Sequence, residues 1–78
     1  MANKIKLIWD FRGADAQKTA EHHAIHLQQF GEREKIERET GTEFISKTHA
    51  IAFFIVDMEN MVVVRDALLP HRGTLVKE

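Results

Sequence analysis

The sequence predicts a small α+β domain with the element order β-α-β-β-α-β. Apolar and polar residues alternate over residues 4–11, which is the period of a half-buried strand. Residues 14–30 instead repeat apolar side chains at helical spacing. The third observation is an apolar run over residues 50–56, followed by a second helical segment that stops at Pro70. Together these patterns favour a sheet packed against two helices.

Size and composition predict one domain over residues 1–78 whose core is marginal. A chain this short buries only about 60% of its unfolded surface, so such domains often gain stability from a metal, a disulfide or a partner chain. The chain has no cysteine, which excludes disulfides, thiolate metal sites and cysteine nucleophiles. Its net charge of −1 gives no global attraction to nucleic acid or anionic lipid. It has neither a signal-peptide run nor a membrane-length apolar run, and we expect a bacterial-type cytoplasmic protein.

The first strand has one strongly apolar face, which we expect to meet the helices. The apolar set is Ile5, Leu7, Trp9 and Phe11. The other face has Lys4, Lys6, Ile8 and Asp10.

The first helix follows the strand directly, with Asp15 placed to cap it. Its apolar stripe comprises Ala16, Ala20, His23, Ala24, Leu27 and Phe30. We expect the packed helix to end near Gly31. Residues 32–39 form a charge run with opposite charges at i,i+4, typical of a solvated helical extension, with Gly41 as a plausible stop.

A hairpin and a second helix complete the chain. Residues 42–47 and 50–56 are expected to form the hairpin, turning near Thr48 and His49. Asp57 can cap a helix over residues 58–69, and residues 74–77 read as a last short strand. The wide apolar face expected for that helix consists of Met58, Met61, Val62, Leu68 and Leu69.

This element order is that of the ferredoxin-like fold: a four-stranded antiparallel sheet with both helices on one face. The opposite face would then show Ile8 beside one of two sets from the third strand, Ala52/Phe54/Val56 or Ile51/Phe53/Ile55. Such an apolar patch is rarely left in water. We therefore expect a homodimer that forms through the open sheet face.

Three segments carry a resemblance to a known superfamily. They are the WDF ending of the first strand, the AFFIVD strand that runs into a helix, and the closing LLPHRG. With the element order, they resemble the dimeric α+β barrel superfamily, in the style of its small bacterial members and of YCII-related proteins. The resemblance implies the fold and a cleft between helix and sheet, without implying one reaction. YCII-related proteins pair a histidine with an aspartate, and His23 or His26 with Asp10 could play those parts here.

The histidines of the first helix are expected to lie in different environments. His22 and His26 are at i,i+4, a spacing that lets two imidazoles reach one zinc or other divalent ion. A closed site would need further ligands, such as His49 or His71, and the simpler interpretation is two exposed histidines. We therefore expect no cofactor, with a divalent metal as the alternative.

His23 lies in the middle of the packed stripe. It is either a core histidine satisfied by a neighbouring polar group, or a general base in a cleft beside Trp9 and Asp10. His26, at the edge of the stripe, is the better candidate for the mouth of such a cleft.

Two cationic positions are further candidates for ligand binding. Arg65 lies within the apolar arc of the second helix, where it could snorkel to solvent, pair with a carboxylate or bind an anionic ligand. His71 follows that helix, where positive charge is favoured, and could contact an anion. With Trp9, these residues form the predicted ligand-binding set.

Three functions compete. The first is a small dimeric ligand-binding or interaction module. The second is a cofactor-independent enzyme, monooxygenase-like or isomerase-like, with a helix histidine as acid and base. The third is RNA binding of the RRM type, since the HAIAFFIV segment loosely follows its aromatic motif. There, Ile51 and Phe53 would occupy the stacking positions, and the missing aromatic and negative net charge disfavour this hypothesis.

Overall fold

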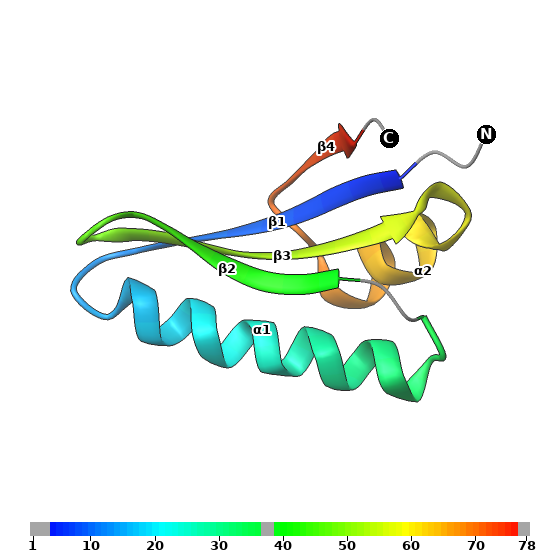
Figure 1. Cartoon of the computed structure of the whole chain (residues 1–78), viewed down its shortest axis with the longest axis horizontal. Coiled ribbons are helices and arrows are strands. Elements are labelled where there is room, and N and C mark those ends of the chain that lie inside the picture. The colour runs from blue at the N-terminus through cyan, green and yellow to red at the C-terminus, as the bar shows by residue number, and fades with distance from the viewer. Residues whose placement is uncertain (1–3, 37–38, 77–78) are drawn as a thin grey trace.

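The computed structural model describes residues 4–36 and 39–76, and it confirms an α+β fold with a four-stranded antiparallel sheet and two helices. The strands lie in the order β2-β3-β1-β4 (Figure 1). The elements along the chain are β1 (Lys4–Arg12), α1 (Ala16–Arg33), β2 (Glu39–Ser46), β3 (His49–Asp57), α2 (Met58–Leu68) and β4 (Arg72–Val76).

The two central strands pair over their whole length, whereas β4 covers only half of its neighbour. The register of β1 with β3 runs from Lys4 opposite Asp57 to Arg12 opposite His49. The β1–β4 ladder stops where Ile8 lies opposite Arg72. Beyond Ile8, therefore, no strand of the described chain pairs with this edge of β1.

Both helices contribute to one core on one face of the sheet, as the alternation in β1 predicts. Leu7 and Trp9 of β1 share this core with the even-numbered residues of β3, because the register sets Leu7 opposite Phe54 and Trp9 opposite Ala52. The largest fully buried side chains in the described chain are Phe54, Leu27, Val56 and Val64. The two helices thus depend on the same strands for their burial.

The helix α1 ends at Arg33, close to Gly31, where the end of the packed helix was expected. Lys35 adopts the left-handed conformation with φ of 59°, a position that glycine usually takes. The Ile36 N–H donates to the Gly31 carbonyl at 2.7 Å, and the Lys35 N–H donates to the Glu32 carbonyl at 3.3 Å. These two bonds form a Schellman motif, and the buried side chain of Ile36 supplies its apolar contact.

The proposed helical extension through the charge run is wrong beyond Arg33, because residues 34–36 form this turn and β2 begins at Glu39. Gly41, expected to stop a helix, lies in this strand. A Cβ at Gly41 would come within 2.8 Å of the Phe53 ring, so glycine at this position lets the ring lie across β2. The part of the run at positions 37–38 lies outside the described residues.

The buried face of the helix α2 is narrower than its sequence predicted. Val64 is its one fully buried residue, and Met61 and Leu68 pack beside it. Val62 and Leu69, both expected on the apolar face, are 46% and 72% exposed. Leu69 lies past the helix end in the left-handed conformation, which turns it away from the core. The last strand, β4, begins at Arg72 and not at Thr74 as expected, and position 77 lies outside the described residues.

The sheet face turned away from the helices carries Ile8, Ile51, Phe53 and Ile55, which decides between the two sets considered above. Its apolar residues are less exposed than expected. Ile8 and Ile51 are only 4% and 3% exposed. Long polar side chains lie on the same face, so much of the patch is covered within a single chain.

Candidate functional site on the open sheet face

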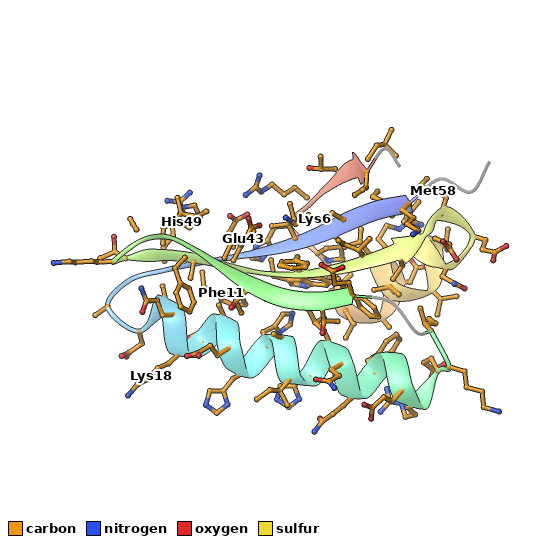
Figure 2. The ribbon with its side chains drawn as sticks, viewed as in Figure 1. Lys6, Phe11, Lys18, Glu43, His49 and Met58 are labelled. Atoms are coloured by element: carbon orange, nitrogen blue, oxygen red, sulfur yellow. The ribbon has the colours of Figure 1, made fainter. Side chains whose placement is uncertain are left out.

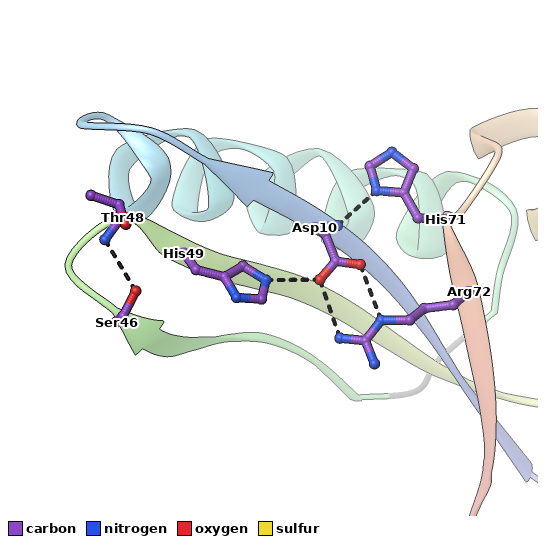
Figure 3. A network of polar contacts seen from close by, with 6 residues as sticks. All are labelled: Asp10, Ser46, Thr48, His49, His71 and Arg72. Atoms are coloured by element: carbon purple, nitrogen blue, oxygen red, sulfur yellow. Dashed lines mark hydrogen bonds and ion pairs between the residues drawn. The ribbon is translucent and has the colours of Figure 1, made fainter.

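Asp10 is the centre of a polar cluster on the open sheet face (Figure 3). Its carboxylate accepts two bonds from Arg72, from Nε to Oδ2 at 3.0 Å and from Nη2 to Oδ1 at 3.1 Å. Its Oδ1 also lies 3.0 Å from Nε2 of His49. The carboxylate is therefore held from both sides, by a bidentate arginine and by an imidazole.

The sheet register brings these three residues together from distant parts of the sequence. Asp10 lies on the central strand β1. Its neighbours on that face of β1 are Arg12, opposite His49 of β3, and Ile8, opposite Arg72 of β4. Both partners thus lie diagonally across from Asp10, within reach of a long side chain.

Electrostatics keep the Asp10 carboxyl group ionised. The Arg72 guanidinium, with help from His49, lowers the pKa of Asp10 from 3.8 to about 2. The same ion pair raises the pKa of Arg72 above its ordinary value. An ionised carboxylate can only accept hydrogen bonds, so a neutral His49 must donate from Nε2. Its Nδ1 is then the bare acceptor, and no side chain in residues 4–36 or 39–76 bonds it.

His71 holds the backbone of the same aspartate. The Asp10 N–H donates to Nδ1 of His71 at 2.8 Å (Figure 3). The His71 N–H in turn donates to the Ile8 carbonyl at 2.9 Å. The predicted ligand-binding histidine therefore lies at the edge of the site, with one ring nitrogen engaged by the protein.

A second polar pair lies on the same face beside the cluster. Lys6 Nζ is 2.6 Å from Oε2 of Glu43 and 4.5 Å from the centre of the Phe53 ring. Figure 2 shows Lys6, Glu43 and His49 on the side of the sheet turned away from α1, whereas Phe11 points toward that helix. This pair forms part of the polar cover over the apolar residues of the open face.

His23 lies on the opposite face of the sheet from the Asp10 carboxylate. Its ring packs between Trp9 and Phe11, with ring centres 5.0 Å and 5.4 Å away. Its Nε2 is buried and has no hydrogen-bond partner within residues 4–36 and 39–76. Burial lowers the pKa of His23, and the nearby His26 and His71 lower it further.

The other predicted residues are dispersed. His22 and His26 are exposed on α1. Across residues 4–36 and 39–76, no group of three or more histidine or acidic side chains is placed to hold a metal ion. Arg65 is about half exposed on α2, and its Nε lies 3.2 Å from the Asp66 carboxylate. Trp9 is buried, and its indole donates to the Leu68 carbonyl. Of the predicted set, Asp10 and His71 meet in the polar cluster on the open face, and Trp9 meets His23 on the helix side of the sheet.

A separate cleft of about 530 Å³ lies at the C-terminal end of α1. It is lined by Gln28, Gly31, Glu32, Ile36, Glu39, Thr40 and Phe54. The predicted cleft between helix and sheet thus has a counterpart in the fold, but its lining includes none of the predicted site residues.

His49 and Arg72 are the site residues that sequence reasoning missed. His49 was considered only at the hairpin turn and as a spare metal ligand, and Arg72 only within the closing LLPHRG segment. The available signal was position: His49 directly precedes the apolar run over residues 50–56, which was expected to lie in the same sheet as the strand of Asp10. Using it would have required the register, which the sequence alone does not provide.

Comparison of the chain with protein-family models, with curated proteins and with solved structures finds no match in any of the three. Within residues 4–36 and 39–76, neither helix combines the length and apolarity needed to cross a bilayer. The α+β architecture and the Asp10 cluster are therefore the two features from which a function can be inferred.

Proposed function

We propose that this chain is a ferredoxin-like domain of the dimeric α+β barrel type that binds a small carbonyl or amide compound on its open sheet face. The β-α-β-β-α-β order and the strand order β2-β3-β1-β4 support the fold assignment. The contribution of both helices to one core supports it as well.

The observation that carries the ligand proposal is the paired arrangement of His49 and Arg72 around Asp10. When neutral His49 donates from Nε2 to Asp10, its Nδ1 is left as a bare acceptor. Arg72 keeps N–H groups that the Asp10 carboxylate does not use. These two groups, one on each side of the Asp10 carboxylate, complement a small ligand that carries both a donor and an acceptor, such as an amide or an enol. Because Arg72 and Asp10 neutralise each other, the site favours a neutral ligand over a strongly charged one.

We infer that two copies pack together through their open sheet faces and thereby enclose this site. In a single chain the cluster is shallow, with the side chains of His49 and Asp10 18% and 20% exposed. The face is also self-compatible, because the positive Lys6 and Arg72 balance the negative Glu43 and Asp10. A pair would further supply the burial that a 78-residue chain lacks.

Binding is tested with 2-pyrrolidinone, a cis-amide, by NMR titration of the wild-type protein. We expect saturable shifts of the His49 ring and the Arg72 side chain. His49→Gln and Asp10→Asn should each weaken binding about tenfold or more, as expected for a lost charge-assisted bond. The matched control is His22→Gln, an exposed histidine on α1 that should bind like wild type. Wild-type titrations without shifts at His49 and Arg72 would reject this ligand class.

Light scattering over the micromolar range tests the pairing. We expect the mass of two chains for the wild type, and of one chain after Lys6→Glu, which places like charges beside Glu43. The control is Lys18→Glu on the exposed surface of α1. A wild-type protein that stays monomeric across this range would refute the pairing.

A second candidate function is proton transfer without a cofactor, favoured by the tautomer that Asp10 imposes on His49. His49 Nδ1 would take a proton from the carbon beside a carbonyl, and the electron pair would move onto the carbonyl oxygen near Arg72. Returning the proton to the other end of the enolate would complete an isomerisation. In this scheme His49 takes the role that the sequence analysis gave to His23 or His26.

Deuterium exchange into the C2 position of acetoacetate in heavy water tests this second function. We expect exchange above the buffer rate for the wild type, reduced at least tenfold in His49→Gln. Binding of 2-pyrrolidinone without any exchange would leave a ligand-binding module. The RNA-binding hypothesis gains no support, because Phe53 lies beneath Lys6 on a face of mixed charge.

A further inference from the structure

The β1–β4 ladder is extended by a side chain where the paired strand ends. Beyond the pairing of Ile8 with Arg72, the His71 N–H donates to the Ile8 carbonyl at 2.9 Å. The next donor along this edge is the Asp10 N–H, and it bonds Nδ1 of the His71 ring at 2.8 Å. The imidazole thus occupies the place that a carbonyl of a longer strand would have taken.

Two consecutive residues therefore hold Asp10 at different points. His71 binds its backbone amide, and Arg72 binds its carboxylate with two hydrogen bonds. Without the ring, the amide would lie at a free strand edge, where the end of a ladder frays. The direction of the Asp10 carboxylate, and with it the distance to His49, depends on that backbone remaining fixed.

We propose that His71 is a positioning residue, whose neutral imidazole fixes the backbone of Asp10 and so sets the geometry of the Asp10–His49–Arg72 cluster. The effect of His71 on ligand binding rests on the proposed function, but its effect on the geometry of Asp10 does not. The ring must keep Nδ1 unprotonated, because an imidazolium has two donors and no acceptor. The titratable and charged groups around this ring are Asp10 on β1, Arg72 on β4 and His23 on α1.

Two substitutions at His71 distinguish the effect of the acceptor atom from the effect of the side chain's shape. His71→Asn places an amide oxygen near the position of Nδ1, whereas His71→Leu has similar size and no acceptor. The readouts, both taken without ligand, are the Asp10 amide proton shift and the pH titration of the Asp10 carboxyl carbon. His22→Leu on α1 controls for the loss of a histidine as such, and amide spectra verify that each variant is folded.

We expect the pKa of Asp10 to stay near 2 in the wild type, His71→Asn and His22→Leu. In His71→Leu it should rise toward 3.8, and the Asp10 amide proton should move upfield as its hydrogen bond is lost. Equal Asp10 titrations and amide shifts in folded His71→Leu and wild-type protein would overturn the proposal.

A pH profile distinguishes positioning from general stabilisation. In the wild type, the Asp10 amide shift should change as the His71 ring is protonated, and in His71→Asn this step should disappear. If the amide shift follows the ring but no variant binds 2-pyrrolidinone, the proposed ligand class fails while His71 remains a positioning residue. If the amide shift does not follow the ring, the positioning role fails regardless of binding.

Discussion

The indole Nε1 of Trp9 donates a hydrogen bond of 2.8 Å to the backbone carbonyl of Leu68, which ties the middle of β1 to the last turn of α2. The last carbonyls of a helix lack partners within the helix, so this bond satisfies one of them. Trp9 is 3% exposed and therefore also belongs to the core. One side chain thus joins the sheet to the shorter helix by a hydrogen bond as well as by packing.

Replacing Trp9 by Phe tests this connection. The substitution keeps an aromatic ring but removes the donor and leaves a small cavity, and we expect the free energy of unfolding to fall by about 2–4 kcal/mol. Urea unfolding followed by circular dichroism measures the change. The control is Val62→Ala on the exposed side of α2, expected within about 0.5 kcal/mol of wild type. A Trp9→Phe protein as stable as the control would contradict the role of this bond.

Gly31 should not tolerate a side chain, although it lies within a helix. A Cβ there would lie 2.8 Å from the Ile36 carbonyl oxygen and 3.0 Å from the Phe54 ring. Alanine favours helix by about 1 kcal/mol over glycine, but overpacking against a backbone oxygen costs about 1–3 kcal/mol. We expect Gly31→Ala to be destabilising overall in thermal unfolding. Gln29→Ala, at an exposed position of α1, is the matched control, and stabilisation by both changes would show that the Schellman turn can shift.

Acid should remove the stabilising effect of Asp10. Its pKa is about 2 in the folded chain and 3.8 when unperturbed, so its contribution is complete above 3.8 and is lost as the pH falls through 2. Solvent screening limits that contribution to about 1 kcal/mol at neutral pH. Asp10→Asn should therefore be less stable than wild type at pH 7, with the two unfolding curves converging near pH 2. A difference that persists unchanged at pH 2 would assign the effect to something other than the charge.

Acid should also reduce stability through His23, but over a higher pH range than through Asp10. Its pKa is lowered by burial, so below 6.5 the unfolded chain binds more protons than the folded chain. Stability from the neutral ring is complete above 6.5 and falls as the pH drops toward the folded pKa. We expect His23→Phe to lose less stability than wild type between pH 7 and pH 5 in chemical unfolding. His22→Phe, at an exposed position, should keep the wild-type slope, and equal slopes for all three proteins would refute the prediction.

Much of the fold could be predicted from local patterns, because burial imposes its period on the sequence. The alternation in β1 identified both the strand and the face that carries Trp9, and the stripe of α1 identified Leu27 and Phe30 as core residues. The error at the end of α1 has a specific cause. A glycine usually marks such a turn, but here Lys35 takes the left-handed position and Gly31 serves close packing.

The candidate site was predictable only in part. Asp10 was selected as the aspartate of the histidine–aspartate pair that the resemblance implies, but its expected partners were histidines of α1. Those side chains lie on the helix side of the sheet, whereas the Asp10 carboxylate lies on the open side. Successive residues of a strand alternate between faces, so Trp9 and Asp10 could not both have faced the same histidine.

The sequence by itself determined the element order, the apolar face of β1 and the absence of any thiol chemistry, since these depend on residue identity and local spacing. Only the tertiary structure decided that Asp10 meets His49 and Arg72, separated from it by 39 and 62 positions. The physical reason is register. Pairing β1 with β3 on one side and with β4 on the other sets which side chains lie diagonally opposite, and a shift by one residue would move each to the other face.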